Sequence, residues 1–129
     1  MRSLYPGAIV SINYLGGIEH VGIVSDRFHK GYPMIISASR RTGVVAEERL
    51  EDFSDGKEIR VKGFPGSFSV RQVLVRARSM IGTKYNLLKW NCEHFVHWAH
   101  GMKVESKQLH RAVMVFGLLA VMYVLIRKR

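Results

Sequence analysis

The sequence predicts an α+β domain in which a short helix packs on a small antiparallel sheet. Three observations predict this class. Short apolar segments separated by glycine and proline turns fill the first half of the chain, and helical spacing of apolar residues begins after Ser69. The only cysteine, Cys92, stands at the start of a second helical pattern. At 129 residues the chain is long enough for one domain with a modest core.

Five segments in the first half have the alternation or the β-branched content of strands. Turn residues separate them: Pro6-Gly7 precede the first segment, Gly16-Gly17 follow it, and Gly31 to Pro33 lie between the second and the third. This order predicts an antiparallel meander. A polar stretch before the last segment, 47–57, has room for one helical turn. The expected strands are 8–13, 18–26, 34–39, 44–46 and 59–62.

A turn-rich loop at 63–67 leads into the helical part of the chain. From Val70 to Ile81, apolar residues recur at helical spacing, and Gly82 ends the pattern. We assign this apolar face to core packing. The segment 83–88 then connects to the helix that carries the cysteine.

Cys92 is expected in the first turn of that helix. Asn91 has a side-chain oxygen suited to an N-cap, and Gly101 is a natural C-terminal stop. Free N–H groups and the positive end of the helix dipole stabilise a thiolate there, which favours a lowered thiol pKa and a nucleophilic sulfur. The alternative is a buried cysteine that acts as a small apolar residue. The apolar face of the helix consists of Cys92, Phe95, Val96 and Ala99.

His20 is a candidate base for such a nucleophile. It stands near the start of the second expected strand, and histidine is the usual base for a cysteine. Distance in sequence is no obstacle, since such pairs meet only in the fold. The alternative is a strand histidine satisfied by a local hydrogen bond.

Together, His20-Val21-Gly22-Ile23-Val24 and Asn91-Cys92-Glu93-His94-Phe95-Val96 resemble two boxes of the lecithin:retinol acyltransferase (LRAT)-like family. The resemblance runs from about Pro6 to Gly101, and 36–44 and 76–82 are also similar to short bacterial members. It implies a circularly permuted NlpC-type, papain-like fold in which the histidine precedes the cysteine. It also implies a thioester-forming acyltransferase or hydrolase, with Cys92 as nucleophile and His20 as base.

The third catalytic position departs from the family pattern. Animal phospholipase/acyltransferase members carry a second histidine on the next strand, where this chain has Ser37. Strand alternation puts Ile35, Ser37 and Ser39 on one face, so two hydroxyls are candidates for orienting His20. A hydroxyl accepts a hydrogen bond from an imidazole but offers no charge to stabilise the imidazolium.

The C-terminal tail predicts a membrane anchor. Ala112 to Ile126 is fifteen residues without a charge, which spans only about 22 Å as a helix, against about 30 Å of hydrocarbon. Arg111 and Arg127 are able to snorkel, and the segment is apolar on all sides. We therefore expect a catalytic domain at residues 1–105, facing the cytoplasm, and a single membrane span within 106–129. A buried core helix is the alternative.

The net charge of +10 indicates an anionic partner, either a membrane surface or nucleic acid. Six of the twenty basic residues lie in 103–129, beside the apolar tail, where they attract anionic headgroups. The sequence shows no zinc spacing, aromatic RNA-binding motif or helix-turn-helix pattern, so we expect a membrane and no nucleic acid. The single cysteine excludes an intramolecular disulfide framework and suits a reducing compartment.

No cofactor or metal is expected. His94, His97 and His100 lie three apart on the cysteine helix, but no additional cysteine and no acidic cluster accompanies them. We assign them to the solvated outer face of the helix. Glu93 is expected to stabilise the first helical turn through the dipole, although its charge also tends to raise the thiol pKa.

Three functions are weighed for these residues. The first is a membrane-anchored thiol acyltransferase or phospholipase-type hydrolase that acts on a phospholipid or other acyl-lipid through an acyl-Cys92 intermediate. The second is a membrane adaptor that keeps the fold without efficient turnover. The third is a cysteine peptidase or amidase on the same fold.

Overall fold

A computed structural model describes residues 3–14, 17–87, 90–103 and 107–127. It confirms an α+β fold in which five antiparallel strands form one sheet in the order β4-β3-β2-β1-β5. The strands are β1 (Ile9–Asn13), β2 (Glu19–His29), β3 (Tyr32–Ala38), β4 (Val45–Glu48) and β5 (Arg60–Gly63). The helices are α1 (Leu50–Ser54), α2 (Val70–Ser79), α3 (Cys92–Ala99) and α4 (Lys107–Arg127).

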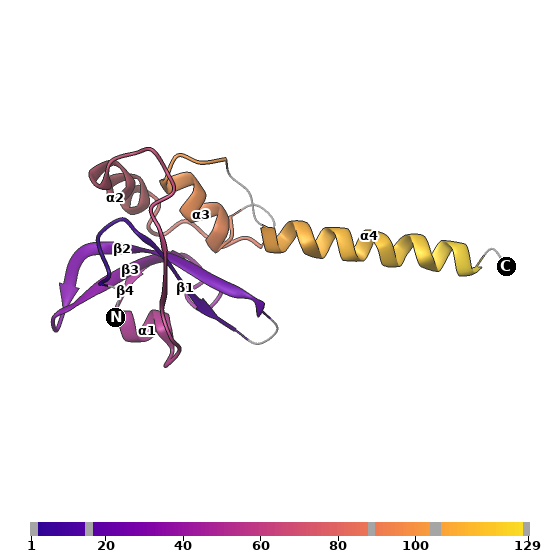
Figure 1. Ribbon diagram of the computed structural model, residues 1–129, viewed down its shortest axis with the longest axis horizontal. Helices are drawn as coiled ribbons and strands as arrows, with labels where there is room; N and C mark the ends of the chain where they lie inside the picture. Colours follow the sequence, from indigo (N-terminus) through magenta and orange to yellow (C-terminus); the bar gives the residue numbers. More distant parts are fainter. Residues whose placement is uncertain (1–2, 15–16, 88–89, 104–106, 128–129) are drawn as a thin grey trace.

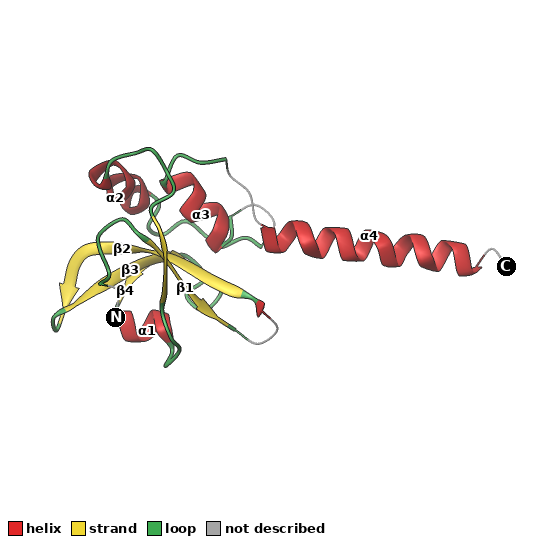
Figure 2. Cartoon of the chain, in the orientation of Figure 1, coloured by secondary structure: helices red, strands yellow, loops and turns green. Residues whose placement is uncertain are grey.

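The sheet lies between two unequal layers (Figures 1 and 2). Helices α2 and α3 cover one face, and the single turn of α1 covers the other. The core divides in the same way, because alternate residues of each strand point to opposite faces. Val21 and Ile23 join the core beneath α3, whereas Val24 joins the core around Phe53 of α1.

The expected meander from β1 to β4 is present, and β5 returns to pair with the free side of β1. The one helical turn expected within 47–57 is α1. Gly16 of the predicted first turn lies outside the described residues, as does Leu88 before the cysteine helix.

The start of α3 is fixed by a capping box. The Asn91 side chain accepts hydrogen bonds from the Glu93 and His94 amides, and Nδ1 of His94 accepts one from the Asn91 amide. At the other end, Gly101 has φ +72°, a conformation that glycine adopts without a Cβ penalty. Both predicted ends of the cysteine helix are therefore confirmed.

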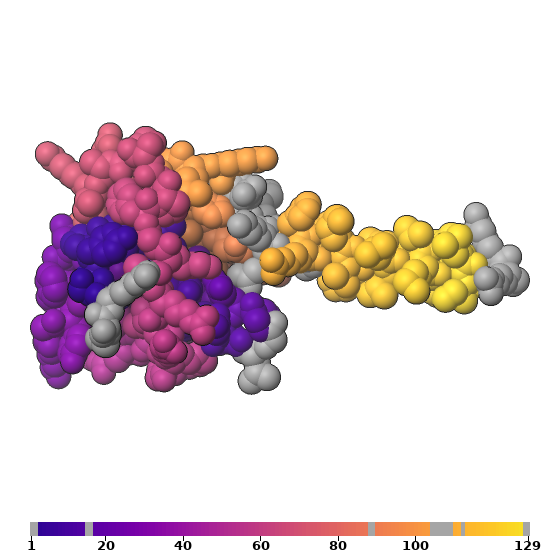
Figure 3. Space-filling model, in the orientation of Figure 1, coloured from indigo at the N-terminus to yellow at the C-terminus, as the bar shows by residue number. Residues whose placement is uncertain are grey.

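The tail forms α4, which projects away from the sheet as a single helix (Figures 1 and 3). The prediction of a single membrane span is wrong: in the described part of the chain, no helix is both long enough and apolar enough to cross a membrane. The physical reason is the shortness of its uncharged stretch, since α4 begins at Lys107 and includes Arg111. The predicted domain boundary after residue 105 falls outside the described residues.

Candidate active site

Cys92 is the first residue of α3, and 8% of its surface is exposed. Three backbone amides face its sulfur and lower the pKa of the thiol, those of Val21, Glu93 and Cys92 itself. Two of these amides belong to the free N–H groups at the start of α3. The third comes from β2, so it joins the start of the helix to the strand that carries His20.

The Val21 amide is free to bind the sulfur because of the sheet register. Val24 donates its N–H to Ala8, at 2.9 Å, and Tyr14 donates its N–H to Ile18, at 2.7 Å. Hydrogen-bonded pairs alternate along an antiparallel ladder, so the even-numbered residues of β2 make backbone hydrogen bonds to β1. The backbone N–H of Val21 therefore points away from β1, toward β3. The register between β2 and β3 begins only at the Ile23–Ile36 pair. The Val21 amide thus lies beyond the paired part of β2 and β3, where it faces the Cys92 sulfur.

The pKa of the Cys92 thiol is raised, contrary to the expectation from its place in the helix. Burial is the largest cause, and the Glu93 carboxylate also raises the pKa. The backbone amides lower the pKa, but by less than burial raises it. The thiol is therefore protonated at neutral pH, and a partner must remove its proton during a reaction.

His20 lies on the α1 side of the sheet, where it is 8% exposed. Its ring packs against Phe53, at 5.0 Å between centroids, and against Tyr14, at 6.2 Å. Burial lowers the pKa of His20 to about 4, and the nearby Arg41 guanidinium adds to this effect. The imidazole is thus neutral at pH 7 and has a lone pair to accept a proton.

The structure brings the His20 strand to Cys92 but does not join the two side chains. His20 directly precedes Val21, whose amide binds the sulfur. Among the described residues, no hydrogen bond links the imidazole to the thiol. Catalytic hydrogen bonds are often long before substrate binds, so this geometry is compatible with a base that approaches the thiol in a complex.

Of the two hydroxyls expected near His20, Ser37 is the one that meets it. Its Oγ lies 3.5 Å from Nε2 of His20, and the side chain is buried. Ser39 instead accepts a hydrogen bond from the Arg41 amide, at 3.1 Å, and so stabilises the turn after β3.

Tyr85 is a site residue that the sequence did not reveal. It is half-buried against the core that contains Cys92, and its amide donates to the carbonyl of Gly43, at 2.8 Å. Burial raises the pKa of Tyr85, with a further contribution from the charge of Cys92, while Arg40 opposes the shift. No motif marks this tyrosine in the segment between two helices, where it resembles any aromatic residue that packs on a core.

The three histidines of the cysteine helix do not share a solvated face, so that prediction is wrong. His94 is buried as part of the helix cap, and His100 is fully buried, with Nε2 donating to the Gly7 carbonyl at 2.8 Å. His97 is partly exposed. Within the residues that the structure describes, no group of three or more histidine, cysteine, aspartate or glutamate side chains is placed to hold a metal ion.

A groove of about 420 Å³ opens beside the nucleophile. Val21 and Glu93 line it, and they are two of the residues whose amides hold the sulfur. Its other walls combine apolar side chains with charged ones from β5 and α4. These include Ile9, Val96 and Met102 among the apolar residues, and Lys62 and Arg111 among the charged ones.

A family model described as "Lecithin retinol acyltransferase" matches residues 10–104, well over half of the chain. The matched range contains His20, Ser37 and Cys92 and ends before α4. Comparison with curated proteins gives no match.

Proposed function

The chain belongs to the lecithin retinol acyltransferase family, and on that premise we propose that it acts on lipid esters through an acyl-Cys92 intermediate. Membership indicates an enzyme of the acyltransferase or hydrolase type. One observation carries the more specific proposal: the buried sulfur at the start of α3 is bound by the amide of Val21, the residue directly after His20. A nucleophile at a helix start and a neutral histidine on the adjoining strand are the two groups that thioester chemistry requires.

In the first step, the Cys92 sulfur attacks the carbonyl carbon of the ester while its proton passes to Nδ1 of His20. The C–O bond to the alcohol then breaks, and the departing oxygen takes the proton from the imidazolium. An acyl thioester remains on Cys92. Water, an alcohol or an amine attacks the thioester and passes a proton to His20, which returns it to the sulfur.

Two groups support the charge that develops in this reaction. The backbone amides around the sulfur are donors in a site that largely excludes water, where such donors are most effective. The Tyr85 hydroxyl, from the segment before α3, is a further donor for the carbonyl oxygen. Both are fixed before substrate binds, the amides by α3 and β2, and Tyr85 by its backbone bond to Gly43.

The groove beside Cys92 supports a lipid as the substrate. Its apolar residues accept the first carbons of an acyl chain, and the cations Lys62 and Arg111 are placed to meet an anionic headgroup. The Lys62 ammonium is paired with the Glu19 carboxylate and would exchange that partner for the ligand. A peptidase or amidase would use the same thioester chemistry, but the apolar residues that line the groove favour an acyl chain.

An adaptor without turnover remains the second candidate, and two observations favour it. The pKa of the thiol is raised, and no hydrogen bond joins the thiol to His20. An adaptor would bind lipid through the groove and release no product.

The experiment that separates these functions uses phosphatidylcholine vesicles and follows released fatty acid and lysophospholipid. We expect product from the wild-type chain and from Ser79→Ala, an exposed control on α2, and none from Cys92→Ala. Vesicle binding with no product from any of the three would favour the adaptor. Cleavage of an acyl-amide or peptide substrate with no release from vesicles would favour the amidase.

A further inference from the structure

The face of the sheet that meets α1 carries a line of three polar side chains, two of them buried and the third largely covered. His20, Ser37 and Glu48 come from three neighbouring strands, and the exposed fraction of the Glu48 side chain is only 10%. Glu48 pairs with Ile35 in the register of β3 and β4, and Ile35 and Ser37 share a face. Glu48 is therefore the diagonal neighbour of Ser37, within reach of its hydroxyl.

Hydrogen bonds give this line a direction. The register places the Ser37 hydroxyl to donate to the Glu48 carboxylate, an interaction that lowers the pKa of Glu48. A hydroxyl has one proton, so its oxygen must act as the acceptor toward Nε2 of His20, 3.5 Å away. The proton of the neutral imidazole then resides on Nε2, and the lone pair resides on Nδ1. This tautomer leaves Nδ1 free to take the thiol proton.

We propose that Glu48 is a positioning residue for the reaction, which acts through Ser37 to orient His20 and to stabilise its imidazolium form. This inference rests on the proposed function, because it assumes that His20 removes the Cys92 proton. Glu48 supplies the negative charge that Ser37 lacks. Its carboxylate, which one hydroxyl separates from the ring, offsets the positive charge that forms on the imidazole during attack. The chain thus replaces one histidine with a serine and a glutamate.

Other charged groups face this line. Arg41 pairs with the Glu48 carboxylate, and its charge also lowers the pKa of His20. The pKa of Glu48 is raised. Burial is the largest cause, and the charge of the Asp52 carboxylate on α1 adds to it. Phe53 and Tyr14 cover the ring itself with apolar surface. Arg41 therefore lowers the pKa of His20, and in our proposal Glu48 acts on the imidazole with the opposite sign.

The test compares Glu48→Gln with Glu51→Gln, which changes an exposed carboxylate on the neighbouring helix turn. Glu48→Gln keeps the shape of the side chain and removes its charge. We expect kcat for a soluble p-nitrophenyl ester to fall about tenfold with little change in KM, which corresponds to one unit in the pKa of the base. The control should match wild type in kcat, KM and melting temperature.

Two further measurements distinguish this role from plain structural support. In a Cys92→Ala background, NMR titration should show that Glu48→Gln lowers the pKa of His20 and that Arg41→Gln raises it. In kinetics, Ser37→Ala should reduce kcat, and adding Glu48→Gln should reduce it no further, because the relay is already broken.

Three results would overturn the inference. The first is an unchanged His20 pKa and kcat in Glu48→Gln. The second is a kcat loss in the double variant equal to the product of the single losses, which would mean that Glu48 acts independently of Ser37. The third is an equal kcat loss in Glu51→Gln. If one of these results is found and Cys92→Ala still loses turnover, only the role of Glu48 is wrong and the proposed function stands. Full turnover in Cys92→Ala would overturn the proposed function itself.

Discussion

The two faces of the sheet differ in chemistry, although the same five strands build both. The face beneath α2 and α3 is an apolar core whose edge holds the thiol of Cys92. The opposite face, which packs against α1, carries the three polar side chains of His20, Ser37 and Glu48. The sulfur and the imidazole therefore lie in different layers, and β2 joins them, because the Val21 amide faces the sulfur and His20 directly precedes Val21.

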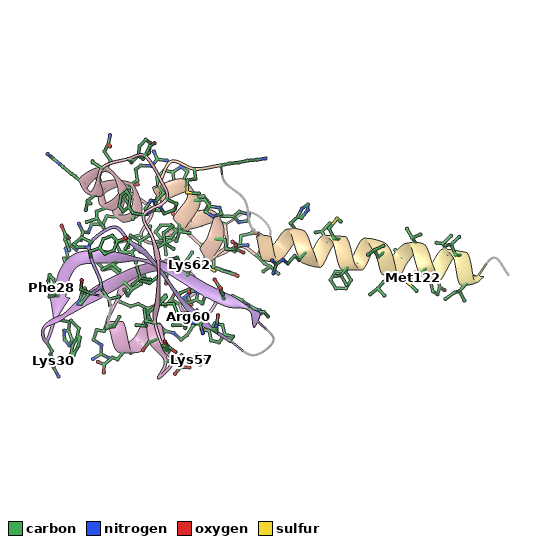
Figure 4. All side chains as sticks on the ribbon, in the orientation of Figure 1. Phe28, Lys30, Lys57, Arg60, Lys62 and Met122 are labelled. Atoms are coloured by element: carbon green, nitrogen blue, oxygen red, sulfur yellow. The ribbon has the colours of Figure 1, made fainter. Side chains whose placement is uncertain are left out.

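This difference shows how a small sheet can hold a protonated thiol and a neutral imidazole at the same time, one on each face. Burial on each face favours the neutral form of the group that it contains, since it raises the pKa of the thiol and lowers that of the imidazole. Both groups are therefore uncharged at neutral pH, and the proposed mechanism makes them an ion pair only when a substrate is attacked. Charged side chains also follow the β5 edge of the sheet, with Lys57 in the segment before β5 and Arg60 and Lys62 on it (Figure 4).

The largest expected effect comes from removing the base on the α1 face. His20→Gln keeps a polar side chain but cannot take a proton, so turnover of a soluble ester should fall by about 10²-fold or more. His29→Gln, on the same strand and outside the site, is the control and should behave as wild type. Equal turnover in the two variants would break the pairing of the two faces.

The second prediction concerns the loss of folding stability in acid. Since the pKa of His20 is about 4 in the folded protein and 6.5 when free, the unfolded state binds the proton more readily. The contribution of His20 to stability is present above pH 6.5 and is lost as the pH falls from 6.5 toward 4. The full loss is about 3 kcal/mol, to an order of magnitude.

Urea unfolding at a series of pH values measures this loss. His20→Gln should be less sensitive to acid than wild type across the same window. His94 and His100 also have lowered pKa values and leave a residual slope of the same sign. An identical slope in wild type and His20→Gln would show that the imidazole is not held neutral by the α1 face.

A third change tests how tightly α1 packs on the sheet. A Cβ on Gly22 would lie 2.9 Å from a ring carbon of Phe53 and 2.6 Å from a methyl carbon of Ile35. Gly22→Ala should therefore cost about 1–3 kcal/mol in the free energy of unfolding. It should also disturb His20, which shares that face. Gly117→Ala on α4 is the matched control, because its Cβ would meet no atom within 4 Å.

The smallest effect is expected on the α3 face. Asn91→Ala removes the side-chain cap of α3 and should cost about 1 kcal/mol. Asn91→Asp keeps an acceptor oxygen for the Glu93 and His94 amides and should lose less. Circular dichroism melting of the two variants gives the comparison, and equal melting temperatures would mean that the side-chain cap contributes little.

Local patterns predict the fold well, because strands and helices follow from spacing and turn residues. The Asn91 cap, the Gly101 stop and the single turn in 47–57 are examples. Burial is not local, so the raised pKa of Cys92 and the buried positions of His94 and His100 could not be read from the helix pattern. The tail is a different case, because its fifteen uncharged residues are visibly short for a span in the sequence, and the prediction gives more weight to their apolar composition and basic flanks.

The candidate site divides in the same way. Cys92, His20 and Ser37 follow from the family resemblance, and the structure places Ser37 beside His20. Glu48 could not be found in sequence, because its relation to Ser37 depends on the register of β3 and β4. Tyr85 likewise depends on how the segment before α3 folds back toward the thiol.

The central claim is that Cys92 forms an acyl thioester with His20 as its base. Intact-mass spectrometry after rapid mixing with an activated acyl ester tests it most directly. The account predicts an acyl adduct that maps to Cys92, forms much more slowly in His20→Gln and is absent in Cys92→Ala. No adduct in the wild-type chain under conditions where ester is consumed, or equal adduct formation with and without His20, would contradict it.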